Sequence, residues 1–357
     1  MVPVIKSKRV LIIKLTSMGD LMHALPALTD ARSVWPDIVF DWVVDETFAE
    51  VPSWHPAVDK IYTSAHRRWK KNFWASTRAG EFKRFYRELN RHDYDLVIDA
   101  QNNVKSSFIS MLRHGPVHGM DKASVAEQPA YLAYANRIPI DKNQHAIARQ
   151  RQLFATALDY PLPDSTPDYG LRQDAFRRPD IALPDRYLFL VHNASWTTKL
   201  WPQSHWHSLI EKAGGDGFHV LLPGGNREEL DRAETIAKAH DNAIALPRLS
   251  LSETGGLIQG AAGAVCCDTG LAHLTAMTGT PAVTLYGPTS ARLIGTTGKK
   301  QDQLVASPQP FHCAPCYKRD CHYRQPKTSM SACMEAFTVE EAWSTLQVLM
   351  NDRDMSG

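Results

Sequence analysis

The stretch from Asp268 to Leu274 reads Asp-Thr-Gly-Leu-Ala-His-Leu and follows a small apolar run over residues 261–267. An apolar run, a small-residue turn and a helical pattern predict a strand, a turn and a helix in succession. The backbone N–H groups of residues 269–271 would then lie at the helix start, where the dipole favours a phosphate or pyrophosphate. Asp268 or Thr269 could equally be an ordinary N-cap, which needs no ligand.

Composition indicates a globular chain of more than one domain. The 357 residues are 43% hydrophobic and 22% charged, with a net charge of +2. That length suits two domains of ordinary size. The small net charge predicts no strong overall field, so any affinity for anions must come from local basic patches. We find no apolar run near the ~20 residues of a membrane helix and no signal peptide, so we expect a cytoplasmic protein with mostly reduced cysteines.

Strands and helices alternate along most of the chain. The apolar runs predict strands at Arg9–Leu15, Phe40–Asp45, Leu96–Asp99, Tyr187–His192, His219–Pro223, Ala264–Cys267 and Ala282–Tyr286. Helical spacing follows at Leu21–Ser33, Glu81–Asp95, Gln203–Ala213, Glu228–His240, Leu271–Thr278 and Val339–Met350. This alternation predicts an α/β fold with parallel, doubly wound sheets that are covered on both faces.

The alternation stops between Asp159 and Asp185, where the sequence contains five prolines. Such composition is typical of an interdomain linker. We therefore expect an N-terminal Rossmann-like domain over residues 1–165, a linker over 166–185 and a C-terminal Rossmann-like domain over 186–335. A final helix would occupy residues 336–357. Two such domains leave a cleft between the carboxyl ends of their strands, where open α/β sheets bind ligands.

Two charged residues follow predicted strands and are candidates for chemistry. Asp20 lies in Met18-Gly19-Asp20, at the start of the first predicted helix. It could be a general base that faces the cleft or only a helix cap. Lys199 follows the Tyr187–His192 strand and could meet a phosphate held at the Asp268 turn. A solvated loop lysine is the alternative.

A basic run, His66-Arg67-Arg68-Trp69-Lys70-Lys71, has an aromatic residue within it. It could be a solvated face, or it could receive phosphates, the carboxylates of an acidic sugar or an anionic membrane surface. The near-neutral total charge argues against nucleic acid as the partner.

Two further features leave their function open. Gly224-Gly225 follows a predicted strand without a Gly-x-Gly-x-x-Gly pattern, so a dinucleotide cofactor is not supported. Glu229, just beyond, could accept hydrogen bonds from a ribose or be an exposed helix residue. The tail contains a cysteine cluster, Cys313, Cys316, Cys321 and Cys333. These cysteines could form a zinc site, a redox-sensitive pair or a set of reduced thiols.

Several motifs in both halves together resemble glycosyltransferase family 9, the heptosyltransferases. The resemblance lies in Lys14–Ala31, Phe40–Val44, Pro52–His55, Arg67–Trp69, Val97–Gln101, His118–Asp121 and Asp268–Leu271. It covers roughly residues 9 to 300, with the motifs in the family's order. The tail departs from it, because a cysteine cluster of this kind is more familiar from relatives that add the second heptose.

This resemblance implies a GT-B fold, with two Rossmann-like domains facing each other across a cleft and the last helix packing back on the N-terminal domain. It implies inverting, metal-independent transfer of L-glycero-D-manno-heptose from ADP-heptose to Kdo of the lipopolysaccharide inner core. Asp20 would be the catalytic base and Lys199 would hold the pyrophosphate. The implied donor-binding residues are Ser195, Lys199, Glu229, Leu249, Asp268, Thr269, Gly270, Leu271 and His273. The implied acceptor-binding residues are Thr16, Ser17, Arg67, Arg68, Lys70 and Lys71.

The expected partners are ADP-heptose and Kdo-lipid A, at the cytoplasmic face of the inner membrane. We expect no cofactor, no catalytic metal, no nucleic acid and no stable protein partner. Three alternatives stay open: transfer to the first heptose, a GT-B-like nucleotide-sugar epimerase or hydrolase, and a non-catalytic nucleotide-sugar binder. An epimerase or hydrolase would release free sugar without an acceptor, and a binder would turn nothing over.

Overall fold

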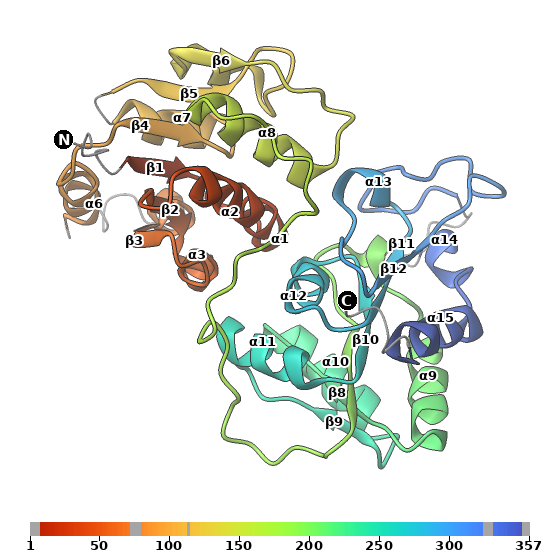
Figure 1. The fold of residues 1–357 in the computed structure, drawn as a ribbon. Coiled ribbons are helices and arrows are strands. Elements are labelled where there is room, and N and C mark those ends of the chain that lie inside the picture. Colours follow the sequence, from red (N-terminus) through yellow and green to blue (C-terminus); the bar gives the residue numbers. More distant parts are fainter. Residues whose placement is uncertain (1–7, 72–79, 113–114, 324–330, 352–357) are drawn as a thin grey trace. The chain divides into compact units, whose positions relative to one another are not determined.

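The computed structural model describes residues 8–71, 80–112, 115–323 and 331–351. The chain forms two units, one that ends at Ala175 and one that begins at Phe176. This division falls inside the proline-rich segment that the sequence indicates as a linker. Each unit has its own sheet of six parallel strands (Figure 1).

The first unit contains a sheet in the order β3-β2-β1-β4-β5-β6. Its strands are β1 (Arg9–Ile13), β2 (Val39–Asp45), β3 (Val58–Ser64), β4 (Leu96–Asp99), β5 (Val117–Met120) and β6 (Asn136–Ile138). Its helices are α1 (Met18–Met22), α2 (Leu25–Val34), α3 (Glu50–Ser53), α4 (His66–Lys71), α6 (Glu81–Leu89), α7 (Val104–Met111) and α8 (Ala146–Leu158), with short 3₁₀ turns η1 (Glu46–Phe48) and η2 (Gln128–Ala133). Residues 10–13 of β1 are fully buried. Such a run suits a central strand covered on both faces.

The first helix differs from the prediction. A single helix over Leu21–Ser33 was expected, but α1 begins three residues earlier and ends before a separate α2. Pro26 explains the break, because proline has no N–H to donate and is accommodated in the first turn of a helix. Ser17, and not Asp20, is the N-cap of α1.

The second unit repeats the same strand order, as β12-β11-β10-β7-β8-β9. Its strands are β7 (Tyr187–Val191), β8 (His219–Leu222), β9 (Ala243–Ala245), β10 (Gly263–Cys267), β11 (Ala282–Tyr286) and β12 (Gln301–Val305). Its helices are α9 (Gln203–Gly215), α10 (Arg227–Ala237), α11 (Leu251–Gly260), α12 (Gly270–Thr278), α13 (Ala291–Ile294), α14 (Ala332–Glu335) and α15 (Val339–Asn351), with the 3₁₀ turn η3 (Thr197–Lys199). In each unit the order reverses beside the first strand, which places a ligand-binding crevice at the carboxyl ends of β1 and β4, and of β7 and β10.

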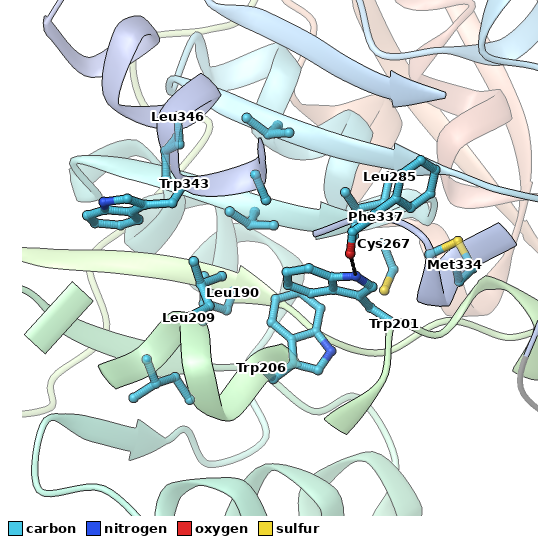
Figure 2. Packing of buried hydrophobic residues seen from close by; sticks show 14 of the residues in the cluster. Leu190, Trp201, Trp206, Leu209, Cys267, Leu285, Met334, Phe337, Trp343 and Leu346 are labelled. Carbon is cyan, nitrogen blue, oxygen red and sulfur yellow. Dashed lines mark hydrogen bonds between the residues drawn. The ribbon is translucent and has the colours of Figure 1, made fainter. Parts of the chain in front are cut away.

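Helix α15 closes the apolar core of the second unit. Trp343 and Leu346 belong to one cluster with Trp201 and Trp206 (Figure 2). The Trp201 and Trp206 rings meet edge to face at 4.9 Å, and the Trp201 indole N–H donates to the Phe337 carbonyl at 3.0 Å. The helix contacts α9, β10, β11 and β12. The buried side chains of this helix find apolar partners on the second unit's own sheet. Its expected packing on the first domain stays a prediction.

Candidate functional site

The turn after β10 has the predicted form of strand, turn and helix. Thr269 is the N-cap of α12, and its hydroxyl accepts a hydrogen bond from the Leu271 N–H at 3.3 Å. Thr269, Gly270 and Leu271 are half-buried, whereas Asp268 is buried. The capping interpretation is therefore confirmed for Thr269. The N-terminus of α12 can still bind an anion, because a capping hydroxyl leaves the positive end of the helix dipole in place.

Lys199 lies at this turn. Its ammonium is 2.7 Å from Asp268 Oδ2, with side-chain exposures of 13% and 4%. The Thr289 hydroxyl donates to the same carboxylate oxygen at 2.6 Å. The ammonium also lies over the Trp196 ring, 4.9 Å from its centroid. A cation is thus held beside the start of α12, although β7 and β10 are far apart in sequence.

The turn that carries Lys199 is fastened by side-chain hydroxyls. Thr198 donates to the Lys318 carbonyl at 2.8 Å, and Ser331 donates to the Thr198 carbonyl at 2.6 Å. The sequence analysis missed Thr289 and Ser331. Thr289 could have been noticed, since it follows the end of β11, at the same edge of the sheet as Asp268. Nothing in the sequence singles out Ser331.

Other predicted donor residues follow neighbouring strands of the same sheet. Ser195 follows β7 and is exposed. Glu229 lies in the first turn of α10, where its carboxylate accepts a hydrogen bond from the Gly225 N–H at 2.8 Å. Leu249 precedes α11 and is half-buried, and His273 is buried within α12. Because parallel strands end at one edge, Ser195, Glu229 and Leu249 share an edge of the sheet with Asp268.

Asp20 belongs to the first turn of α1. Its Oδ2 accepts hydrogen bonds from the Ser17 N–H at 2.9 Å and the Ser17 hydroxyl at 2.8 Å. Asp20 is half-buried and Ser17 is exposed. The adjacent Thr16 N–H donates to the Gln101 side-chain oxygen at 3.0 Å. The two hydrogen bonds from Ser17 fix the orientation of the Asp20 carboxylate. A fixed orientation suits a general base, but it also suits a residue that only stabilises the start of a helix.

Two cations that the sequence analysis missed act on Asp20. Lys14 is buried, and its ammonium donates to the Ala100 carbonyl at 2.9 Å. Burial lowers the pKa of Lys14, and the negative charges of Asp20 and Asp99 oppose that shift. Burial also lowers the pKa of Arg149, again opposed by Asp20. A lysine at the end of an otherwise apolar strand was the available signal for Lys14.

Asp99 is a buried carboxyl group at the carboxyl end of β4. Burial raises its pKa to about 6, although hydrogen bonds from Asn102, Tyr134 and Ser106 act in the opposite direction. The Tyr134 hydroxyl donates to it at 2.8 Å, as does the Ser106 hydroxyl. With these partners Asp99 fixes the turn that follows β4.

The predicted acceptor patch lies on α4. The Arg68 guanidinium is paired with Glu81 at 2.8 Å and with Glu46 at 3.1 Å. The Trp69 indole N–H donates to the same Glu81. The charge of Arg68 is therefore already compensated within the first unit. The side chains of the other predicted members, Arg67, Lys70 and Lys71, lie outside the described residues.

The four cysteines of the tail line one cavity of about 180 Å³. All six cysteines of the chain are free. Across residues 8–71, 80–112, 115–323 and 331–351, no three histidine, cysteine or carboxylate side chains are arranged to hold a metal ion. The zinc alternative thus has no preformed site in that part of the chain.

Comparison with known proteins agrees with the fold. The family described as Glycosyltransferase family 9 (heptosyltransferase) matches residues 82–326. Lipopolysaccharide heptosyltransferase 1 of Pseudomonas aeruginosa is 45% identical over 317 residues, which cover 88% of each protein. The structure of Escherichia coli heptosyltransferase WaaC with ADP has a TM-score of 0.79 at 42% identity, covering 84% of this chain and 93% of that one. The same protein with ADP-2-deoxy-2-fluoro heptose gives 0.76 at 41% identity, with the same coverage.

Each unit has the strand order of a Rossmann sheet, and in the second unit Lys199 and the N-terminus of α12 lie near the point where that order reverses. Together with the similarity to heptosyltransferase WaaC, this architecture assigns the chain to the glycosyltransferases of the GT-B type. Within that class, the chain belongs to glycosyltransferase family 9, the heptosyltransferases.

Proposed function

We propose that the protein transfers L-glycero-D-manno-heptose from ADP-heptose to Kdo of the lipopolysaccharide inner core, with inversion and without a metal ion. The observation that carries the proposal is Lys199 beside Asp268 at the start of α12. The named relatives support the substrates: one is a lipopolysaccharide heptosyltransferase 1, and a structural relative carries an ADP-heptose analogue.

In the donor half, the pyrophosphate binds at the N-terminus of α12. As the bond between heptose and phosphate breaks, negative charge grows on the departing ADP. Lys199 and the α12 dipole stabilise that charge from fixed positions, the task that a magnesium ion performs in metal-dependent transferases. Ser195 and Thr269 bind phosphate oxygens, Glu229 the ribose, and Leu249 packs on the adenine. Gly270 lets the phosphate approach the backbone, since it has no Cβ.

In the acceptor half, Asp20 removes the proton from the attacking hydroxyl of Kdo. A single displacement requires the hydroxyl to attack from the side opposite the leaving ADP, so the product has the inverted configuration. The two hydrogen bonds from Ser17 orient the carboxylate. Lys14 and Arg149 place positive charge near Asp20. That charge also favours an acidic sugar such as Kdo.

The acceptor is a lipid, so we further propose that the protein works as a peripheral protein on the cytoplasmic face of the inner membrane. In the described ranges no helix is long and apolar enough to cross a bilayer. The first unit nevertheless exposes large apolar side chains: Phe108 and Met111 of α7 are 52% and 61% exposed, and Leu132 of the contacting η2 is 65% exposed. Such exposed apolar side chains suit contact with a membrane surface.

The direct test is incubation with ADP-heptose and Kdo-lipid A, followed by mass analysis of the lipid. The expected product carries one added heptose. Free heptose without lipid product would indicate an epimerase or hydrolase, and a product that forms only on a lipid with one heptose already attached would indicate a second-heptose transferase. Lys199→Ala should abolish the product, while Lys212→Ala, which removes a lysine of α9 in the same unit, should not.

A further inference from the structure

A thiol-lined cavity lies directly beside the turn that carries Lys199. Its wall includes Thr198 and Ser331 together with Cys313, Cys316, Cys321 and Cys333, and its volume is about 180 Å³. Four thiols around one cavity form a chemically distinct site that the transfer reaction does not use.

The six cysteines of the chain differ sharply in access. Cys313 is exposed and Cys316 is half-buried. Cys266 and Cys267, in contrast, are fully buried in β10, and burial raises the pKa of each thiol to about 12. Because the thiolate is the nucleophile in sulfur chemistry, reagents from solution should react at the cavity and leave β10 untouched.

Within the cavity the other three cysteines lie near enough to Cys333 to act on its thiol. Burial raises the pKa of Cys333, and the charges of Cys313, Cys316 and Cys321 raise it further. Two residues separate Cys313 from Cys316 in a Cys-x-x-Cys sequence, the spacing at which thiols exchange with disulfides in redox proteins.

The segment between Cys316 and Cys321 is mechanically tied to the Lys199 turn. Within it, the Lys318 carbonyl accepts a hydrogen bond from the Thr198 hydroxyl at 2.8 Å, and the Arg319 carbonyl accepts one from the Thr197 hydroxyl at 3.3 Å. The Arg319 guanidinium lies over the Trp196 ring at 5.5 Å from its centroid, the same ring that Lys199 contacts. A shift in the backbone of this loop should therefore move the Lys199 ammonium, because the Thr197 and Thr198 hydroxyls and the Trp196 ring connect the two.

We propose that Cys313 and Cys316 are a modification site for small-molecule disulfides, and that their oxidation weakens donor binding by shifting the loop that holds the Lys199 turn. The inference rests on the proposed role of Lys199 in binding the ADP group. In the first step the Cys313 thiolate attacks a reagent disulfide, forms a mixed disulfide and releases one reagent thiolate. The Cys316 thiolate then displaces the second reagent thiolate and closes the protein disulfide. Two protein thiols and one reagent disulfide thus give one protein disulfide and two reagent thiols.

The experiment equilibrates the full chain with glutathione and glutathione disulfide at a series of ratios. Peptide mass analysis after alkylation reports which cysteines are paired, and calorimetry reports the Kd for ADP. We expect a Cys313–Cys316 disulfide, unmodified Cys266 and Cys267, and a Kd for ADP that rises about tenfold and returns when the disulfide is reduced. Cys313→Ser should abolish the response, and Cys321→Ser, a matched change in the same cavity, should keep it.

Three results would overturn the inference: no Cys313–Cys316 disulfide at any ratio, a disulfide that leaves the Kd for ADP unchanged, or a stoichiometric metal ion bound by the four thiols in the purified protein. The variant Lys199→Ala shows whether a negative result contradicts only the redox inference or also the proposed function. If Lys199→Ala weakens ADP binding while the disulfide does not, the donor site stands and only the coupling is wrong. If Lys199→Ala leaves ADP binding intact, the donor assignment itself fails.

Discussion

Replacing Lys199 with methionine keeps the length of the side chain but removes its charge, and should affect both stability and donor binding. The Lys199 ammonium and the Asp268 carboxylate are 2.7 Å apart, with exposures of 13% and 4%. Two unit charges at that distance attract by roughly 6 kcal/mol at an effective dielectric constant of about 20, before the cost of desolvation is subtracted. Removing one partner leaves Asp268 buried with the Thr289 hydroxyl as its hydrogen-bond donor.

Breaking a buried pair in this way costs about 3–5 kcal/mol. Because Thr289 still donates to the carboxylate, we expect the lower end, about 3 kcal/mol, or roughly 6–12 °C in the melting temperature of a unit of this size. Donor affinity should fall separately. Losing a charged hydrogen bond to phosphate costs about 1.5–3 kcal/mol, or roughly 10- to 150-fold in the Kd for ADP.

Thermal unfolding and calorimetry with ADP measure the two effects, and Lys212→Met is the matched control. Lys212 also forms a 2.7 Å ion pair, with Glu340, but the two side chains are 38% and 72% exposed. An exposed pair of this kind contributes about 0–1 kcal/mol. The double variant Lys199→Met/Asp268→Asn should regain most of the stability but none of the affinity. If Lys199→Met behaves like Lys212→Met in both measurements, then Lys199 neither stabilises the buried Asp268 carboxylate nor binds the ADP phosphates.

The remaining predictions concern the base, the metal and the response to acid. Asp20→Asn should lower kcat by about 10²- to 10⁴-fold, because a general base is lost while an amide oxygen can still accept from Ser17; turnover near that of the wild type at saturating substrates would reduce Asp20 to a helix-turn residue. Activity should survive EDTA, and a complete loss that magnesium restores would contradict the proposed role of Lys199. Burial lowers the pKa of His55 to about 4 from its ordinary 6.5. Between about pH 6.5 and pH 4, His55 is therefore protonated in the unfolded chain but neutral in the folded chain. The free energy of unfolding should fall as the pH falls through that window, by roughly 2 kcal/mol between pH 6.5 and 5. Denaturant titrations of His55→Gln should show a flatter pH dependence than the wild type, and identical slopes would exclude His55 as a cause.

Most of the fold could be predicted because its signals are local. The buried strands are apolar runs, and the β10 turn is encoded by neighbouring residues from Asp268 to Leu271. The break between α1 and α2 could also have been predicted, because Pro26 lies in the first turn of α2, where proline is accommodated. The prediction treated the spacing of apolar residues as decisive and overlooked that proline.

The contacts within the site could not be predicted in the same way. The sequence placed Lys199 near a phosphate, but its pairing with Asp268 depends on β7 and β10 becoming neighbours in the sheet. Ser331 reaches the same turn from 133 positions along the chain. Hydroxyl and carbonyl partners at such separation leave no pattern in one sequence, because only the tertiary fold brings them together.

The place of α15 in the second core has a consequence for synthesis on the ribosome. Trp343 and Leu346 complete the cluster around Trp201 and Trp206, so that core cannot close until roughly 170 residues after Phe176 have been made. At translation speeds of about 5–20 residues per second, this leaves an interval of roughly 10–30 s. During that interval the first unit can already fold, while two tryptophans of the second unit remain open to chaperones or to neighbouring chains. The second unit should therefore be the aggregation-prone part of the nascent protein.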